Sequence, residues 1–428
     1  MNQSLAEQAN RGQEFGSNGG ADQAHIADQP HIADQPHIAV WMPSWVGDAC
    51  MATPTLRALR QSFPAAKLTG IMNPLVSELL ADEGTGPTWF DDRVLFRKKG
   101  RRQLSDGNPI LTRWQLASAL RKRRIDRVLL LSNAWWTAAA SRLAGIKSIV
   151  GYDRDFRSLL LHDRLPVPTE NVGGKSKKSY KPISAIDYYL EIARWVGCDE
   201  PAKAMTLPAT DDDRVRAEQL WQRVGFVDST PTVVINSNSA KDSARIWPAE
   251  NVRELAQRLA VERGLQVLLH CAPNERESAD RIAAEVNHPR VASMGCVEDL
   301  PLGMSRGVMG RASVLVSTDS GARHIAVAMD RPVVTLFGPT IEEWTTTYNV
   351  PEIRLGVALE CRGCYASTCP LQHQNCMKRL TVAQVFNAVG LQLQQAHSGS
   401  GESHARVDVG SDSNAGKKTP RKTKINAA

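Results

Sequence analysis

The sequence predicts an α/β protein with two Rossmann-like domains, whose parallel sheets face each other across a central cleft. Continuous apolar, β-branched runs alternate with helical patterns, which is typical of strands buried on both faces of a parallel sheet. This alternation implies βαβ units with right-handed crossovers. The expected strands are Ile38–Met42, Val128–Ser132, Ser148–Gly151, Thr232–Asn236, Gln266–His270, Val314–Ser317 and Pro332–Phe337.

Apolar residues at three- and four-residue spacing predict the helices between these strands. The clearest examples are Ala52, Leu56, Leu59 and Phe63, and then Val252, Leu255, Ala256 and Leu259. The alternation of strands and helices is interrupted from Leu207 to Ser229. There, Pro208 and the helix-start signal Asp211–Asp213 precede a single helix. We therefore expect a disordered tail over 1–36, a first domain over 37–206, a second over 207–396 and a disordered basic tail over 397–428.

Length and composition exclude several classes of protein. The 428 residues suffice for two or three domains with sizeable cores. The chain is 42% hydrophobic and 23% charged, so it is not disordered throughout. No apolar run approaches the ~18 to 20 residues of a membrane-spanning helix, and the polar first 36 residues hold no signal-peptide core. We expect a cytoplasmic protein whose eight cysteines are too dilute for a disulfide scaffold.

The two tails carry little chemistry. The first contains a tandem repeat, His25–Pro30 and His31–Pro36, which could bind a metal or be an inert duplication. Histidines six residues apart on a flexible chain chelate poorly, so we favour the duplication. The second tail ends in a lysine- and arginine-rich run, which is typical of a solvated segment; contact with anionic surfaces is the alternative.

The formal net charge of +7 is mild, but its distribution is uneven. Basic residues gather in three runs, at 93–102, 121–124 and 175–181, all before residue 185. Charge alone leaves two interpretations open: the first half of the molecule binds an anionic partner, or these residues only solvate its surface.

Two polar segments follow strands where the cleft is expected. In the segment 43–48, Gly47 permits close backbone approach, and Asp48 could be a helix N-cap or a general base. The second segment, 236–248, runs from a strand into a helix that Pro248 can start, and it offers N–H donors to an anion. Arg245 could contact a phosphate there or be an ordinary surface charge.

The most informative segment is Val316–His324. A buried strand ends in hydroxyl residues and a glycine, and a helix then begins, so backbone N–H groups, hydroxyls and His324 could cradle a phosphate. Asp319 can only accept hydrogen bonds when ionised and could hold sugar hydroxyls. The turn Phe337–Thr340 follows the next strand.

Other familiar signatures are absent or weak. No Walker loop and no dinucleotide-binding glycine motif occurs, which argues against a nucleoside triphosphatase or an NAD enzyme. Asp153-Arg154-Asp155 has a metal-binding form, but the intervening arginine favours local ion pairing, and we expect no metal. Four late cysteines could form a zinc knuckle, a structural thiol cluster or adventitious disulfides: Cys361, Cys364, Cys369 and Cys376.

Together these motifs resemble glycosyltransferase family 9. The resemblance rests on Ser44–Asp48 with Thr53-Pro54, on Arg245-x-Trp247-Pro248, on Ser317–Gly321 with His324, and on Pro332–Thr340. Gly151-Tyr152 with Arg157, and the late cysteines, fit as well. The motifs run in order from about Ile38 to Gln394 and are most similar to the ADP-heptose–lipopolysaccharide heptosyltransferases of type II.

The resemblance implies a GT-B fold, an ADP-heptose donor, inversion at the anomeric carbon, and neither metal nor cofactor. It makes Asp48 the catalytic base and places Arg245 at a basic position that is usually lysine. The implied donor-binding residues are Asn236, Ser237, Arg245, Thr318, Asp319, Ser320, Gly321, His324 and Gly338. The family commonly has glycine where Asn238 stands and again near Asp242, which puts donor affinity and identity in question.

The implied acceptor is the inner core of lipopolysaccharide, a heptosyl-Kdo-lipid A type glycolipid. It is strongly anionic, so we expect the first domain to bind it through Arg97, Lys98, Arg121 and Lys177, with peripheral contact at the cytoplasmic face of the inner membrane. Two alternatives stay open: another nucleotide-sugar donor or a different glycan acceptor, and a non-catalytic protein that binds nucleotide sugar or glycolipid. Nucleic-acid binding is not expected, because the basic runs lack interleaved aromatic residues.

Overall fold

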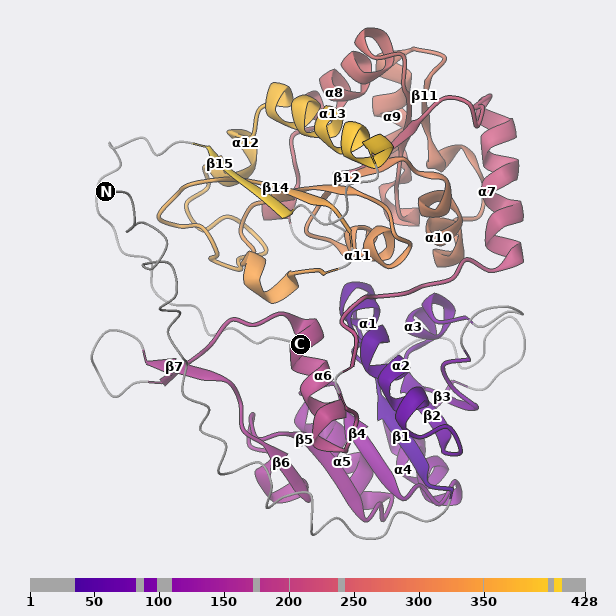
Figure 1. Ribbon diagram of the computed structural model, residues 1–428, viewed down its shortest axis with the longest axis vertical. Helices are drawn as coiled ribbons and strands as arrows, with labels where there is room; N and C mark the ends of the chain where they lie inside the picture. The colour runs from indigo at the N-terminus through magenta and orange to yellow at the C-terminus, as the bar shows by residue number, and fades with distance from the viewer. Residues whose placement is uncertain are drawn as a thin grey trace, which may run out of the picture.

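The computed structural model describes residues 35–81, 88–97, 110–171, 178–199, 201–237, 243–348, 350–398 and 404–409. These residues form two lobes, each built on a parallel sheet covered by helices (Figure 1). The strand order is β3-β2-β1-β4-β5-β6 in the first sheet and β11-β10-β9-β12-β13-β14-β15 in the second. The predicted α/β class with two Rossmann-like halves is confirmed.

The first lobe contains six parallel strands, six helices and a small ribbon. Its strands are β1 (His37–Trp41), β2 (Lys67–Met72), β3 (Asp92–Leu95), β4 (Arg127–Leu130), β5 (Ser148–Tyr152) and β6 (Asp163–Leu165). Its helices are α1 (Val46–Met51), α2 (Thr53–Ser62), α3 (Pro74–Leu79), α4 (Arg113–Lys122), α5 (Trp135–Leu143) and α6 (Ala185–Trp195). The antiparallel ribbon pairs β7 (Thr169–Asn171) with β8 (Lys178–Tyr180).

The second lobe repeats this plan. Its strands are β9 (Thr232–Asn236), β10 (Gln266–Leu269), β11 (Val291–Ser293), β12 (Val314–Thr318), β13 (Val333–Phe337), β14 (Glu352–Val357) and β15 (His404–Val409). Its helices are α7 (Asp211–Val224), α8 (Ala249–Glu262), α9 (Arg276–Val286), α10 (Leu302–Arg311), α11 (Gly321–Ala328), α12 (Asn375–Lys378) and α13 (Val382–Ser398).

All seven strands expected from apolar runs are present, because each is buried in a sheet interior. β9, β12 and β13, for example, are buried along their whole length. The strands that sequence reasoning missed carry polar or charged residues or glycine, such as Gly70 in β2 and Glu352 in β14. In both sheets the strand order reverses between the first and fourth strands in sequence, which is where α/β proteins bind ligands.

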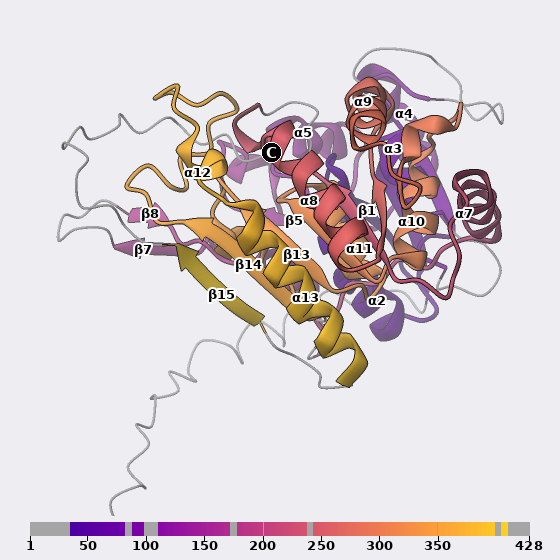
Figure 2. The same cartoon turned by 90° about the horizontal axis from the view of Figure 1, so that it is seen from above.

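The structure corrects the predicted boundaries of both tails. Pro36, placed in the first tail, is buried, and its carbonyl accepts a hydrogen bond from the Lys67 amide at 3.0 Å. In the second tail, α13 continues to Ser398, and β15 pairs with β14 from Glu352↔His404 to Val357↔Val409 (Figure 2). Without β15, β14 would be an unpaired sheet edge. The His repeat, apart from its last two residues Gln35 and Pro36, and the terminal lysines lie outside the described residues.

A capping box explains the start of α7. Thr210 is the N-cap: its hydroxyl accepts from the Asp213 amide at 3.2 Å, and Asp213 accepts from the Thr210 amide at 2.9 Å. The acidic run therefore marks the first turn of the helix and not the cap itself.

Three of the contacts that join the lobes involve α3, the start of α6, and α1. On α3, Glu78 Oε1 accepts from the Leu302 amide at the start of α10 at 2.6 Å. Before α6, Ser184 Oγ donates to the Thr346 carbonyl at 2.8 Å. The third contact, between α1 and α11, lies at the centre of the junction (Figure 1). Among the described helices, none has an apolar stretch of the length that a bilayer requires.

A buried ion pair supports the contact between α3 and α10. Arg306 is 2% exposed, lies 2.8 Å from Asp213 Oδ2, and donates across the junction to the Leu79 carbonyl at 2.6 Å. Arg306→Ala would leave the Asp213 carboxylate buried without its cation, and such a loss typically costs about 3–5 kcal/mol. We expect urea denaturation to show a decrease of this size in the free energy of unfolding.

The matched control is Arg253→Ala, because Arg253 pairs with Glu285 on the surface, where both side chains are close to half exposed. Exposed pairs contribute about 0–1 kcal/mol. Equal losses for the two variants would contradict a special role for the buried pair.

Candidate active site

The four polar segments expected at the cleft do follow β1, β9, β12 and β13, and the segment after β1 contacts the segment after β12. A Cβ placed on Gly47 would lie 2.7 Å from His324 Cδ2, and one on Gly321 would lie 3.1 Å from Val46 Cγ1. The backbone at the start of α1 therefore lies against the start of α11. Glycine at position 47 is explained by this close approach, because a side chain there would force the lobes apart.

Asp48 lies in the first turn of α1 and is not its N-cap, which is Trp45. Its carboxylate is partly buried, and Tyr189 of α6 donates to its Oδ1 at 3.4 Å. Burial raises the pKa of Asp48 to about 6, with a further rise from the charge of Asp319 and a partial offset from Tyr189. A carboxylate with this pKa is a usable general base near neutral pH.

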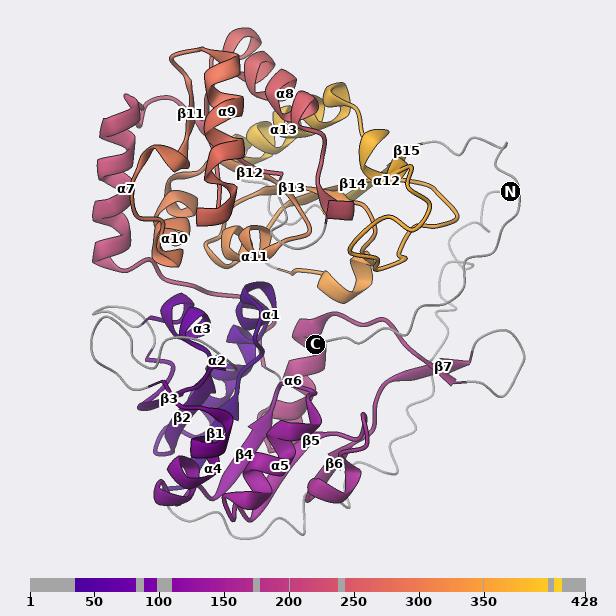
Figure 3. The ribbon, with the colours of Figure 1, turned by 180° about the vertical axis from the view of Figure 1, so that it is seen from behind.

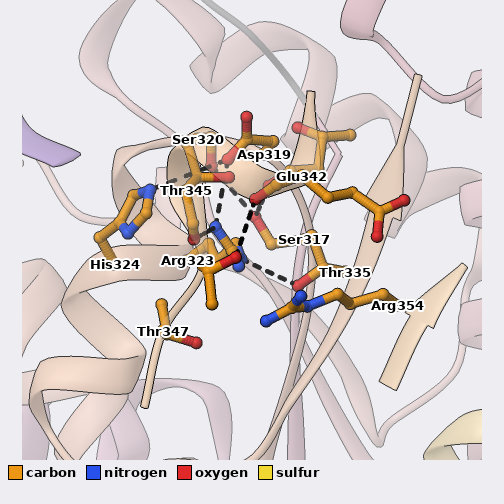
Figure 4. A network of polar contacts seen from close by, with 12 residues as sticks. Ser317, Asp319, Ser320, Arg323, His324, Thr335, Glu342, Thr345, Thr347 and Arg354 are labelled. Atoms are coloured by element: carbon orange, nitrogen blue, oxygen red, sulfur yellow. Dashed lines mark hydrogen bonds and ion pairs between the residues drawn. The ribbon is translucent and has the colours of Figure 1, made fainter. Parts of the chain in front are cut away.

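Asp319 has the opposite electrostatic environment. Burial alone would raise its pKa, but the His324 imidazole and the Arg323 guanidinium hold the pKa of Asp319 well below its usual range. Arg323 Nη1 lies 3.3 Å from Asp319 Oδ1, and His324 Nε2 lies 3.8 Å from the same oxygen (Figure 4). Asp319 is therefore an ionised acceptor, whereas Asp48 can exchange a proton. Two carboxylates whose pKa values differ in this way typically have distinct roles at one site.

Arg323 itself is held by a buried polar network. It is fully buried, and its Nη2 lies 2.7 Å from Glu352 Oε1. Its Nη1 also donates to the Thr345 carbonyl at 2.9 Å, and Arg354 Nε lies 2.9 Å from Glu352 Oε2. Burial opposes ionisation of Glu352, but Arg323 and Arg354 outweigh it and lower the pKa of Glu352 to about 2. The network, part of which Figure 4 shows, ties α11 to β13 and β14.

Arg245 lies beside Asp319. Its Nη1 donates to the Asp319 carbonyl oxygen at 3.1 Å. The 3-10 turn that carries it, Ser243–Arg245, is held by the Ser367 carbonyl, which accepts from the Ala244 amide at 3.1 Å. The segment between the late cysteines therefore supports the turn that carries the candidate phosphate ligand.

The other predicted donor residues gather around the same loop. Asn236 Nδ2 donates to Ser320 Oγ at 3.0 Å, and Ser237 follows it at the end of β9. Thr318 Oγ1 and His324 Nδ1 are buried and have no hydrogen-bond partner among the described residues. Burial lowers the pKa of His324, so its ring is neutral at pH 7. Polar atoms buried in this way are available to a ligand or to water.

Gly338 packs closely against α12. A Cβ at this position would lie 2.4 Å from Met377 Sδ, so glycine suits this packing. Its role in donor binding stays a prediction. Asn238 and Asp242 lie outside the described residues.

Of the predicted acceptor residues, the structure describes Arg97 and Arg121, and it does not bring these two together. Arg97 is exposed just beyond the carboxyl end of β3, on the side of the sheet from which α1 also starts. Arg121 is in the last turn of α4, which leads to the amino end of β4, and its Nη2 donates to the Leu143 carbonyl at the end of α5. Figure 3 shows this end of the first lobe, far from the second lobe. Arg121 therefore cannot share a site with Asp48. Lys98 and Lys177 lie outside the described residues.

Sequence reasoning missed Tyr189, Arg323 and Glu352. The position of Arg323, one turn after Asp319 on a helix, was a usable signal, because residues four apart share a helix face. No local signal points to Tyr189 or to Glu352, since both reach the site only through tertiary packing.

Neither candidate metal site has a metal-binding geometry. In Asp153-Arg154-Asp155, Arg154 Nε lies 2.9 Å from Asp155 Oδ2, which confirms the expected local ion pair. The four late cysteines are free thiols, and those at 361, 364 and 369 are partly exposed. Within the described ranges, no group of three or more histidine, cysteine or acidic side chains is arranged to hold a metal ion.

Comparison with known proteins extends the resemblance seen in the motifs. A family model described as glycosyltransferase family 9 (heptosyltransferase) matches residues 113–375. Lipopolysaccharide heptosyltransferase 2 of Escherichia coli is 25% identical over 318 residues, covering 71% of this chain and 83% of that protein. Lipopolysaccharide heptosyltransferase 1 of Pseudomonas aeruginosa is 29% identical over 341 residues, covering 77% of this chain and 86% of that protein.

Solved structures agree on the fold. The structure of E. coli ADP-heptose lipopolysaccharide heptosyltransferase II aligns with a TM-score of 0.64 at 21% identity, covering 84% of this chain and 99% of that one. The family 9 glycosyltransferase from Veillonella parvula aligns with a TM-score of 0.66 at 19% identity, covering 84% of this chain and 97% of that one. The expected GT-B arrangement is thereby confirmed.

The raised pKa of Asp48 predicts a pH-dependent stability cost. Its pKa of about 6 in the folded protein exceeds the ordinary value of 3.8, so the folded state binds this proton more tightly. The cost of ionising Asp48 therefore grows as the pH rises from about 4 to about 6 and is constant above that. We compare the free energy of unfolding of Asp48→Asn with that of the wild type. The variant minus wild-type difference should be about 2 kcal/mol larger at pH 8 than at pH 4. Denaturant titrations at both pH values measure this difference, and a difference independent of pH would contradict the raised pKa.

Proposed function

Because the chain belongs to glycosyltransferase family 9, we propose that it moves a heptose from ADP-heptose to the inner core of lipopolysaccharide, a heptosyl-Kdo-lipid A type acceptor, with inversion. That the chain is a glycosyltransferase follows from the family match and agrees with the motifs. The donor, the acceptor and the stereochemistry are our proposal. The names of its relatives support it, as does an E. coli heptosyltransferase whose structure contains ADP-2-deoxy-2-fluoro heptose.

The observation that carries the proposal is the juxtaposition of Asp48, from the first lobe, with Asp319 and His324, from the second, where α1 meets α11. An acceptor bound to the first lobe would present its hydroxyl to Asp48. Asp48 would remove the proton while the hydroxyl oxygen attacks the anomeric carbon and the bond to ADP breaks on the opposite face. General-base help of this kind is worth about 10²–10⁴-fold in rate.

The second lobe would stabilise the leaving group. Negative charge develops on the β-phosphate as the glycosidic bond breaks, and Arg245 together with the amides at the start of α11 can meet it. Asp319 is ionised and acceptor-only, which suits it to sugar hydroxyls and not to phosphate. The role of Arg245 explains why its turn is held by separate hydrogen bonds.

The proposal is tested by assaying transfer from a panel of ADP-, GDP- and UDP-linked sugars to Kdo-lipid A acceptors with and without a first heptose, in the presence of EDTA. We expect transfer from ADP-heptose to the heptosylated acceptor. Transfer from another donor only would support the alternative substrate. Binding of ADP without any transfer would support the non-catalytic alternative.

In the same assay, the Asp48→Asn variant tests whether Asp48 is the general base. We expect kcat to fall by about 10²–10⁴-fold while ADP binding, measured by calorimetry, is preserved. In the wild type, turnover should rise with pH through about 6 as Asp48 ionises. Near-wild-type turnover of the variant would remove Asp48 from the role of base.

We also propose that the far end of the first lobe contacts an anionic membrane surface, which would account for the basic run that is not at the active site. Arg121 Nη2 donates to the Leu143 carbonyl, and Arg142 Nη2 donates to the Leu159 carbonyl at 3.4 Å. These contacts bring two exposed leucines, Leu143 and Leu159, beside exposed cations. We call this set the basal surface: Arg121, Lys122, Arg124, Arg142, Leu143, Lys147, Leu159 and Arg164.

Vesicle sedimentation tests the basal surface. Each basic residue near an anionic bilayer contributes about 1 kcal/mol, so Lys122→Gln with Lys147→Gln should weaken binding to phosphatidylglycerol vesicles by about 30-fold. The control replaces two exposed arginines of the second lobe, Arg214→Gln with Arg253→Gln. The proposed contact would be contradicted if both double variants bound vesicles equally weakly, or if the lysine double variant bound them as tightly as the wild type.

A further inference from the structure

Behind the candidate donor loop, four polar side chains form a continuous chain of hydrogen bonds. His270, at the end of β10, lies with its Nε2 2.9 Å from Ser305 Oγ on α10 and its Nδ1 3.0 Å from Asn236 Oδ1. Asn236 Nδ2 in turn donates to Ser320 Oγ at 3.0 Å. His270, Ser305 and Asn236 are buried. Neither the family motifs nor the proposed mechanism uses His270.

The orientation of the Asn236 amide in the structure sets the direction of each bond. The Asn236 carbonyl oxygen can only accept, so His270 Nδ1 must carry the proton. Burial lowers the pKa of His270 to about 4, so the ring is neutral and its Nε2 accepts from the Ser305 hydroxyl. With its oxygen turned to His270, Asn236 must present its NH₂ group to Ser320.

This arrangement gives Ser320 an unusual role for its position. Ser320 is the N-cap of α11, where a serine hydroxyl normally accepts a hydrogen bond from the first turn of the helix. Here the side chain makes no such capping bond and faces Asn236 and Ser317 instead. The amides of the first turn are therefore not used by the cap.

We propose that His270 is a positioning residue for the donor: through Asn236 it holds the Ser320 hydroxyl away from the start of α11 and so leaves those amides to the diphosphate. The inference rests on the proposed function, because it assumes that a nucleoside diphosphate binds there. If His270 cannot donate, Asn236 is free to flip, and Ser320 returns to capping the helix and competes with the phosphate oxygens.

The test measures ADP affinity by calorimetry in the full-length protein. His270→Phe removes the donor and keeps a ring of similar shape, whereas His270→Asn keeps an N–H near the position of Nδ1. We expect His270→Phe to weaken ADP binding about tenfold, as for the loss of one buried hydrogen-bond partner. His270→Asn should restore affinity to within about threefold of the wild type, which a purely space-filling role would not do.

A double-mutant comparison shows whether the effect passes through Ser320. In a Ser320→Ala background there is no hydroxyl to return to the helix, so His270→Phe should cause no further loss of ADP affinity. Equal loss in both backgrounds, or unchanged affinity in the single variant, would overturn the role of His270. Absence of ADP binding by the wild type would overturn the proposed function and, with it, this inference.

Discussion

One buried guanidinium holds together the second lobe's share of the active site. Arg323 is inaccessible to solvent and lies between two carboxylates, Asp319 on the loop before its own helix and Glu352 on β14. Removing it would leave two buried negative charges with fewer partners, which is among the most costly changes a protein interior can undergo. Its charge keeps Asp319 ionised, and the negative charge of Asp319 contributes to the raised pKa of Asp48 across the junction. The chemistry assigned to the first lobe thus depends partly on an arginine in the second.

The parts of this site that sequence could predict are those encoded locally. A buried strand that ends in small polar residues before a helix, as at Ser317–Gly321, can be recognised from the order of residues alone. The same holds for Asp48 after β1, although sequence left open whether it capped the helix. Glu352 could not be found in this way, because its partnership with Arg323 depends on β14 lying beside β13 in a particular register.

Charge was the least reliable guide, since a sequence gives the number of basic residues but not the face that they occupy. The run at 121–124 lies at the amino-end edge of the first sheet because α4 must end there to enter β4. The second tail illustrates the same limit for disorder. The residues of β15 look like a polar linker in isolation and become a strand only because β14 offers an unpaired edge.

The contact of Gly47 with His324 also has a mechanical consequence. Even one added Cβ on Gly47 would clash with the His324 ring, so α1 and α11 have little space to move straight together. Any closure has to be a rocking motion with α1 and α11 as its fulcrum, in which regions far from that point move the most. Asp48 and Asp319 lie beside the fulcrum, so their separation would stay nearly constant while the outer parts of the lobes move.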